Sequence, residues 1–148
     1  MEYRKANEFD VEELVQLRKQ QLLDEGGIME NNIDNELKKY FHENIGNNKF
    51  IAWLAIENNT IIATSGLCFY NLPPNFRNIS GKVAYVTNMF TKKEFRKKGI
   101  ATILLDKIIN EAKILDYKVL RLHTSKYGRR IYEKCGFVDS DGYMHLKI

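Results

Sequence analysis

The spacing of apolar residues near the amino end predicts a helix over residues 11–24. Its apolar face is a stripe at helical spacing formed by Leu14, Val15, Arg18 and Leu22. Asp10 is the expected N-cap, with Glu13 at the capping-box position and Phe9 placed to form a hydrophobic staple with Leu14. Gly26-Gly27 is expected to end the helix.

A second helical stripe follows Asp34 and stops at Gly46, with Leu37, Tyr40, Phe41 and Ile45 on one face. A short strand over residues 3–6 is expected before the first helix. Between the two helices, residues 25–32 form a polar linker that could border a substrate pocket.

From residue 49 onward the pattern becomes typical of strands. Residues 50–56 and 61–70 are rich in β-branched and aromatic side chains, and Asn58-Asn59 between them tolerates a tight hairpin, so an antiparallel pair is expected. Residues 71–81 contain Pro73-Pro74 and no period, which indicates a surface loop before a further strand over residues 82–91.

The last third returns to alternating helices and strands. A helix of about 16 residues begins near residue 100, because apolar residues recur there at helical spacing. A strand over 119–123, a short helix over 129–135 and two final strands over 136–139 and 143–148 complete the prediction. The element order is β-α-α-β-β-β-α-β-α-β-β, which defines an α/β protein with a mixed sheet and helices on its faces.

Length and composition fit one globular domain spanning residues 1–148, with 44% hydrophobic and 28% charged residues. The formal net charge is only +4, yet five of the 23 cations lie in residues 92–98. This concentration favours a local anion site over a general basic coat. Cys68 and Cys135 are far apart and read as reduced thiols. With no apolar run for a signal peptide or a membrane span, we expect a cytoplasmic location and no membrane partner.

The basic stretch contains the turn Arg96-Lys97-Lys98-Gly99-Ile100-Ala101, which leads directly into the long helix. Amides at a helix start lack intrahelical partners, and the helix dipole adds positive charge there. Gly99 has no Cβ and allows a ligand to approach the backbone closely. The turn is therefore a candidate phosphate site.

This turn fits the pattern R/Q-x-x-G-x-G/A, and Tyr132-Glu133-Lys134-Cys135-Gly136-Phe137 fits Y-x-x-x-G-F near the carboxyl end. With these two motifs on the expected elements, the chain resembles the GNAT superfamily of acyl-CoA-dependent N-acetyltransferases. The resemblance implies the GNAT-like fold with a central splayed sheet, and acetyl-CoA as the acyl donor.

The resemblance also implies site residues. The main chain of Met89, Phe90 and Thr91 would run beside the pantetheine arm, with a local splay or bulge in the sheet. Pyrophosphate would be held by backbone amides of Lys98, Gly99, Ile100, Ala101 and Thr102, with Arg96 and Lys97 facing the phosphates. Ser125 stands where the family often has a cofactor-contacting asparagine. Tyr132 would be the general acid that protonates the departing thiolate.

The implied reaction takes place in a ternary complex. A primary amine of a small molecule, a peptide or a protein directly attacks the thioester. The resemblance does not identify the general base, because some family members carry a glutamate where this chain has Leu120. Glu30, Glu25, Asp34 or a water chain could accept the proton.

An alternative function is an acyl-CoA-binding sensor or regulatory module of the same fold without turnover. Nucleic-acid binding is disfavoured, because Phe95 is the only aromatic residue among the cations of the basic stretch. The histidines and cysteines show no metal spacing, so no metal is expected. A homodimer formed by pairing of the terminal strands is possible.

Overall fold

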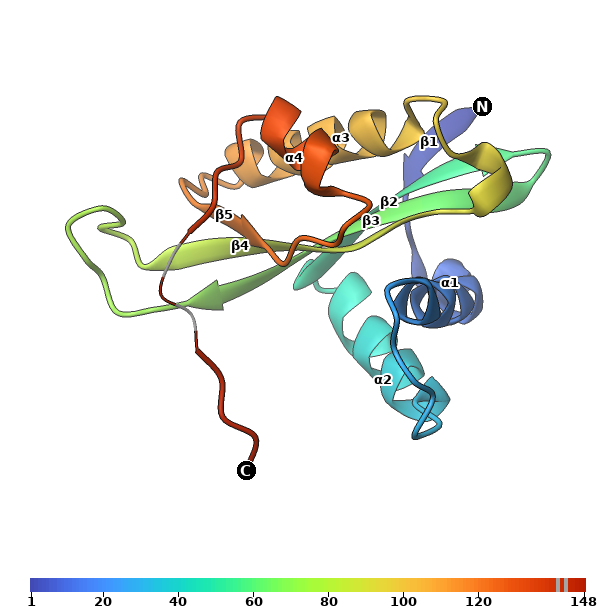
Figure 1. The fold of residues 1–148 in the computed structure, drawn as a ribbon, viewed down its shortest axis with the longest axis horizontal. Coiled ribbons are helices and arrows are strands. Elements are labelled where there is room, and N and C mark those ends of the chain that lie inside the picture. Colours follow the sequence, from blue (N-terminus) through green and yellow to red (C-terminus); the bar gives the residue numbers. More distant parts are fainter. Residues whose placement is uncertain (141, 143) are drawn as a thin grey trace.

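The computed structural model describes residues 1–140, 142 and 144–148, and a five-stranded mixed sheet forms its centre (Figure 1). The strands lie in chain order: β1 (Glu2–Lys5), β2 (Phe50–Glu57), β3 (Thr60–Asn71), β4 (Lys82–Thr91) and β5 (Leu120–Leu122). The first four pair antiparallel, whereas β5 runs parallel to β4.

Helices cover both faces of the sheet (Figure 1). α1 (Val11–Asp24) and α2 (Asp34–Ile45) pack on one face, where Leu14, Phe41 and Leu54 belong to one buried cluster. On the other face lie α3 (Ile100–Ile114) and α4 (Arg129–Lys134), whose apolar side chains join a second cluster with β4. The predicted α/β class and the first nine elements are confirmed.

The predicted hairpin and loop are also confirmed. Asn58 and Asn59 have φ values of 50° and 58° in the turn that joins β2 to β3, the left-handed conformation that asparagine tolerates better than most residues. The segment between β3 and β4 projects as a loop beyond the sheet (Figure 1).

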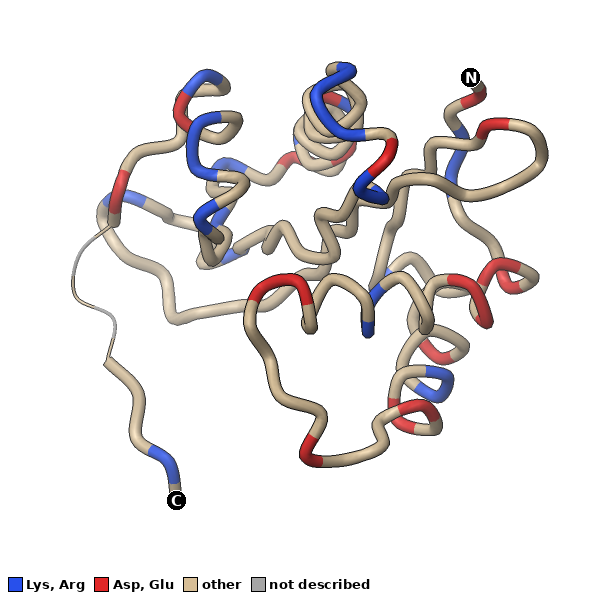
Figure 2. The backbone as a smooth tube through the Cα atoms, turned by 45° about the vertical axis from the view of Figure 1, so that its right-hand side comes forward, with Lys and Arg blue, Asp and Glu red and all other residues tan. Residues whose placement is uncertain are grey.

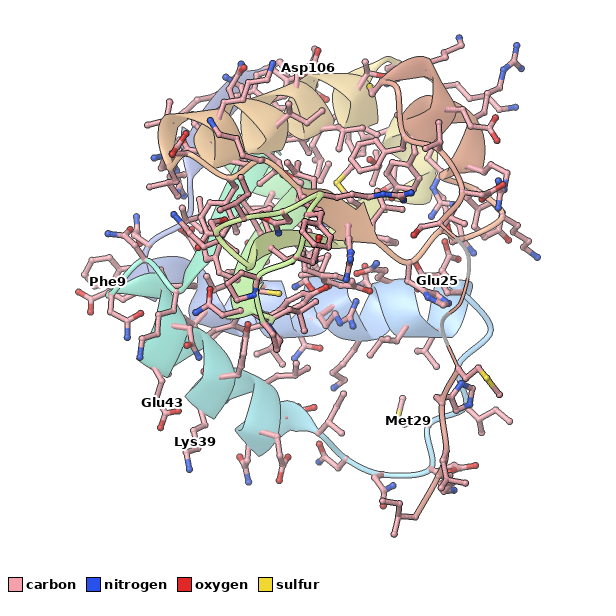
Figure 3. All side chains as sticks on the ribbon, turned by 90° about the vertical axis from the view of Figure 1, so that its left-hand side faces the viewer. Phe9, Glu25, Met29, Lys39, Glu43 and Asp106 are labelled. Atoms are coloured by element: carbon pink, nitrogen blue, oxygen red, sulfur yellow. The ribbon has the colours of Figure 1, made fainter. Side chains whose placement is uncertain are left out.

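The start of α1 differs from the prediction. A short 3₁₀ turn, Glu8–Asp10, precedes the helix, and the capping box belongs to it: the Phe9 amide bonds Asn7 Oδ1, while the Asn7 amide bonds Asp10 Oδ2. Asp10 is the N-cap residue of α1, as predicted, but its side chain makes no capping hydrogen bond to that helix and instead pairs with Arg4 at 2.7 Å. The expected staple is wrong, because Phe9 is 88% exposed and points away from the core (Figure 3).

β4 is irregular where the resemblance implied a splay. Thr64 pairs with Phe90 and Gly66 with Thr87, so β4 carries one extra residue across this step, which is a β-bulge. Asn88 lies in the bulge with φ 52°. The described pairing of β4 with β5 covers only residues 84–86 against residues 120–122. β4 continues beyond this pairing to Thr91, where β5 no longer accompanies it.

The two final strands are a wrong prediction for the described residues. Residues 136–140, 142 and 144–148 belong to no strand, and Asp141 and Tyr143 lie outside the described residues. Val138, Met144, Leu146 and Ile148, which belong to these two segments, are all exposed. Alternation marks which side of a strand is apolar, but a strand also needs a neighbour to bond with.

Candidate active site

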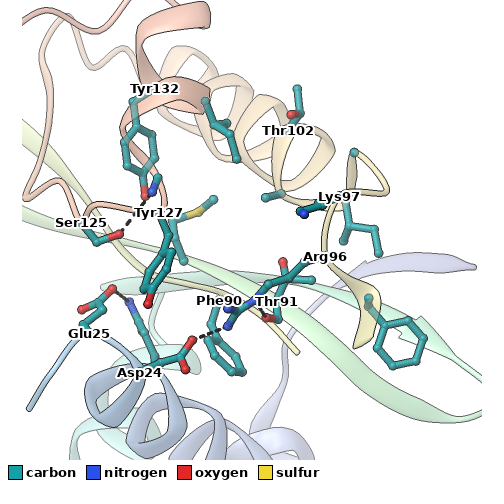
Figure 4. A pocket seen from close by; sticks show the side chains of 18 residues that line it. Asp24, Glu25, Phe90, Thr91, Arg96, Lys97, Thr102, Ser125, Tyr127 and Tyr132 are labelled. Carbon is teal, nitrogen blue, oxygen red and sulfur yellow. Dashed lines mark hydrogen bonds and ion pairs between the residues drawn. The ribbon is translucent and has the colours of Figure 1, made fainter. Parts of the chain in front are cut away.

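A cleft of about 440 Å³ opens where the end of α1, the end of β4, the start of α3 and α4 meet (Figure 4). It brings together nearly all the site residues expected from the sequence: Met89, Phe90, Thr91, Arg96, Lys97, Gly99, Ile100, Ala101, Thr102, Ser125 and Tyr132. Lys98 is the exception, since it does not line the cleft and its ammonium lies 5.0 Å from the Phe95 ring centroid.

The start of α3 forms one end of this cleft. Gly99 is the N-cap with φ 78°, a left-handed conformation that glycine adopts without strain. No side chain among the described residues caps the helix, so its first amides have no side-chain partner there. A helix start with open amides and the positive end of the dipole suits a phosphate group.

Arg96 is already engaged by the protein. Its Nε donates to the Thr91 carbonyl at 2.9 Å, and its Nη2 pairs with the Asp24 carboxylate. The guanidinium also lies 5.7 Å from the ring centroids of Phe90 and Tyr127. The hydrogen bond from Arg96, helped by Lys93, holds the pKa of Asp24 below its ordinary value.

These contacts tie the acidic end of α1 to the basic turn before α3. Figure 2 colours the acidic residues of the first segment red and the basic residues of the second blue. Arg96 thus fixes the position of α1 against β4. Any phosphate contact by Arg96 would have to be made alongside its pairing with Asp24.

Tyr132 lies at the other end of the cleft, on α4. Its side chain is largely buried and its ring packs edge-on against Phe137, with centroids 5.9 Å apart. Burial, together with the negative charge of Glu25, raises the pKa of Tyr132 to about 12. The phenol therefore keeps its proton at neutral pH and can donate it.

Ser125 has a local structural contact. Its Oγ accepts a hydrogen bond from the Gly128 amide at 3.3 Å, in the turn that leads into α4. The hydroxyl lies beside Tyr132 at the cleft wall (Figure 4).

A second cleft, of about 510 Å³, adjoins the first. The two share the residues Gln21, Glu25, Met89, Ser125, Tyr127 and Tyr132. The second is otherwise lined by Arg18, Tyr85, Val86, Thr87, His123, Thr124 and Lys126. Tyr132 is therefore positioned where two ligands in neighbouring clefts would meet.

Among the carboxylates considered as a base, only Glu25 lines these clefts. It follows the last residue of α1, and its Oε1 accepts a hydrogen bond from Gln21 Nε2 at 3.1 Å. Glu30 lines neither cleft, and Asp34 pairs with Lys19 at 2.7 Å. Figure 4 shows Glu25 below the hydroxyl of Tyr132.

Sequence reasoning missed the contribution of α1 to the site. Arg18, Gln21 and Glu25 follow at intervals of three and four residues, so they share one face of the helix. Arg18 stands within the apolar stripe of α1, and a cation in such a stripe is the signal that could have revealed this face. Among the aromatic residues near the long loop, Tyr85 lines the second cleft, whereas Tyr70 and Phe76 do not.

A protonated buried phenol beside a helix start that suits a phosphate, with a second cleft next to it, is an arrangement suited to group transfer from a polyanionic donor. The sequence matches the acetyltransferase (GNAT) family over residues 12–137, and the chain belongs to this family. No curated protein sequence matches the chain significantly.

Solved structures agree with this assignment. A predicted acetyltransferase from Clostridium acetobutylicum, solved with acetyl-CoA, is 44% identical, with a TM-score of 0.95 over 99% of this chain and 95% of that chain. A GCN5-related N-acetyltransferase from Ralstonia eutropha is 17% identical, with a TM-score of 0.88 over 99% and 97%. Glucosamine-6-phosphate N-acetyltransferase from Arabidopsis thaliana is 19% identical, with a TM-score of 0.76 over 99% and 97%. The chain therefore has the GNAT fold.

The described residues contain no helix long and apolar enough to cross a bilayer. In the same part of the chain, no three His, Cys, Asp or Glu side chains gather as a possible metal site.

Proposed function

We propose that this protein is an N-acetyltransferase that transfers the acetyl group of acetyl-CoA to a primary amine by direct attack in a ternary complex. The observation that carries the proposal is the pair of adjoining clefts that share Tyr132 and Glu25. The structure with acetyl-CoA of the relative from Clostridium acetobutylicum supports the choice of donor. Two clefts suit a donor and an acceptor held together, which supplies the orientation for a bimolecular step.

The first cleft fits the donor. Uncapped amides at the start of α3 would hold the pyrophosphate, with Lys97 adding positive charge. The end of β4 beyond the β5 pairing leaves main-chain groups of Met89, Phe90 and Thr91 beside the cleft, where a pantetheine arm could pair with them. An amide near Phe90 would polarise the thioester carbonyl.

Tyr132 would donate the proton that the leaving thiolate needs. A pKa of about 12 keeps the phenol protonated at the working pH. Its position in the wall of both clefts is what a group needs in order to reach the sulfur as the amine attacks.

Glu25 would accept the proton from the attacking amine, directly or through one water. An ordinary alkyl ammonium has a pKa of about 10.4, so only about one molecule in 2,500 is free base at pH 7. A carboxylate next to the acceptor cleft would bind the ammonium and remove its proton. The hydrogen bond from Gln21 holds this carboxylate in place.

The test is thiol release from acetyl-CoA across a panel of polyamines, aminoglycosides, amino acids and peptide amino termini, with mass spectrometry of the product. We expect an acetylated amine and free CoA in equal amounts. Binding of acetyl-CoA without transfer to any amine would favour the sensor function, and absence of acetyl-CoA binding would contradict both.

A further inference from the structure

The cationic side chain of Arg18 lines the second cleft but not the first. It lies on α1, where the nearby residues Leu14, Val15 and Leu17 are fully buried. The side chain of Arg18 itself is half-buried. It does not line the first cleft, so its charge faces the acceptor side of the site and not the donor side.

No carboxylate among the described residues forms an ion pair with Arg18, whose Nη1 donates to the neutral Gln21 Oε1 at 3.0 Å. Other arginines of the chain differ: Arg4 lies 2.7 Å from Asp10, and Arg129 lies 3.0 Å from Asp139. Burial lowers the pKa of Arg18 from its ordinary value, which reflects the cost of keeping this cation out of water.

A half-buried guanidinium without an ion pair, in a cleft open to a ligand, is a recognition group for an anion. Its planar fork matches a carboxylate or a phosphate, to which it can donate two parallel hydrogen bonds. Glu25 lies on the same face of the helix seven residues later, about 10 Å along the axis. The second cleft thus offers two cations, Arg18 and Lys126, and one carboxylate, Glu25.

We infer that the acceptor is a small amine that also carries an anionic group, a carboxylate or a phosphate, which Arg18 binds while the amine lies between Glu25 and Tyr132. The inference rests on the proposed acetyltransfer and adds the class of acceptor. The opposite charges of Arg18 and Glu25 would orient such a molecule with its amine toward the donor cleft, and the reverse orientation would put like charges together.

The experiment compares matched acceptors with and without the anion: 6-aminohexanoate against hexylamine, glycine against glycinamide, and glucosamine 6-phosphate against glucosamine. We expect the anionic member of at least one pair to have a kcat/KM about tenfold or more above its neutral partner, as one charge-assisted hydrogen bond allows. The carboxylate and phosphate pairs show which anion is bound.

Arg18→Met should reduce this preference by about tenfold or more, and Arg18→Lys should retain part of it. The ratio of the kcat/KM values for two acceptors, measured on one variant, does not depend on how much of that variant is folded. A merely structural role of Arg18 would therefore leave this ratio unchanged. Lys39→Met is the matched control, since Lys39 is an exposed cation on α2 outside both clefts (Figure 3).

Two results would overturn the inference: equal kcat/KM within all three pairs, or a preference that persists in Arg18→Met. In both cases transfer to amines would still occur and the proposed function would stand. If no amine in the wider panel is acetylated, the proposed function fails and the acceptor class fails with it.

Discussion

The ring of Tyr132 occupies the space where a side chain on Gly128 would begin. A Cβ at Gly128 would lie 2.5 Å from Cε2 of Tyr132 and 3.0 Å from its hydroxyl oxygen. Gly128 has an ordinary backbone conformation, φ −92° and ψ −23°, which any residue can adopt. The glycine is therefore required by the position of the phenol and not by the turn.

Replacing Gly128 with alanine should displace the Tyr132 hydroxyl without unfolding the protein. We expect Gly128→Ala to lower kcat by about tenfold or more, and Tyr132→Phe to lower it by about 100-fold, as loss of a general acid typically does. The KM for acetyl-CoA should change little in either variant. Steady-state kinetics with a thermal melt of each variant provides the measurement.

Gly46→Ala is the control for this prediction, because a Cβ at Gly46 meets no atom within 4 Å and its φ is −66°. It should keep the parental kcat. Full turnover by Gly128→Ala or by Tyr132→Phe would remove Tyr132 from the mechanism.

The pH dependence of kcat should reflect the raised pKa of Tyr132. Below a pKa of about 12 the phenol holds its proton, so it produces no descending limb between about pH 7 and pH 10. Over the same range the rate should rise as more of the amine becomes free base. A descending limb in this range that disappears in Tyr132→Phe would contradict the assignment.

Glu25→Gln should lower kcat/KM most strongly near neutral pH, by about tenfold or more. The defect should shrink toward about pH 10, because bulk solvent then deprotonates the amine. Glu30→Gln is the matched control, since Glu30 carries the same charge in the same linker but lines neither cleft. A defect of equal size at all pH values would indicate that Glu25 positions the acceptor and does not take its proton.

Gly99→Ala should weaken binding of acetyl-CoA. Its φ of 78° is unfavourable for a residue with a Cβ and costs about 1 kcal/mol, although the space around it is open. We expect a loss of stability of that order together with a larger Kd by calorimetry. Gly136→Ala carries the same backbone penalty at φ 92° but lies outside the cleft, so it should lose stability and keep the Kd. Equal Kd values for the two variants would exclude a role for the α3 start in donor binding.

Much of the fold could be predicted because local signals and tertiary packing agree. The glycines after residues 24 and 45 mark the ends of α1 and α2, and Asn58-Asn59 marks the hairpin between β2 and β3. Gly26, Asn58 and Asn59 have positive φ values, which few other residue types tolerate, whereas Gly46 has an ordinary helical φ of −66°.

Other features depended on partners that a local pattern does not specify. Asn7 and Asp10 satisfy the capping-box spacing as well as Asp10 and Glu13 do, and the contact of Arg4 with Asp10 accompanies the first choice. The bulge at Asn88 likewise depends on how β4 registers against β3, which distant residues decide.

The donor side of the site could be read from its motifs, since a glycine turn before a helix is contiguous in sequence. The acceptor side could be read only in part. Glu25 is one of several candidate bases, but Arg18 and Gln21 come from α1, more than 60 residues before β4. The roles of Arg18 and Gln21 show only when the sheet brings β4 and α4 beside them.

The divergence of β5 from β4 has a consequence for the order of binding. From Thr87 to Thr91, β4 has no strand partner among the described residues on its β5 side. This stretch therefore resembles the edge of an unfinished sheet, with which an extended chain could pair. The pantetheine arm of acetyl-CoA, bound along this side of β4, would pair with it as a neighbouring strand does. The arm would also form one wall of the second cleft. The donor should therefore enter first, the backbone amides of residues 87–91 should exchange hydrogen more slowly once it is bound, and the acceptor should find its site complete only in the loaded protein.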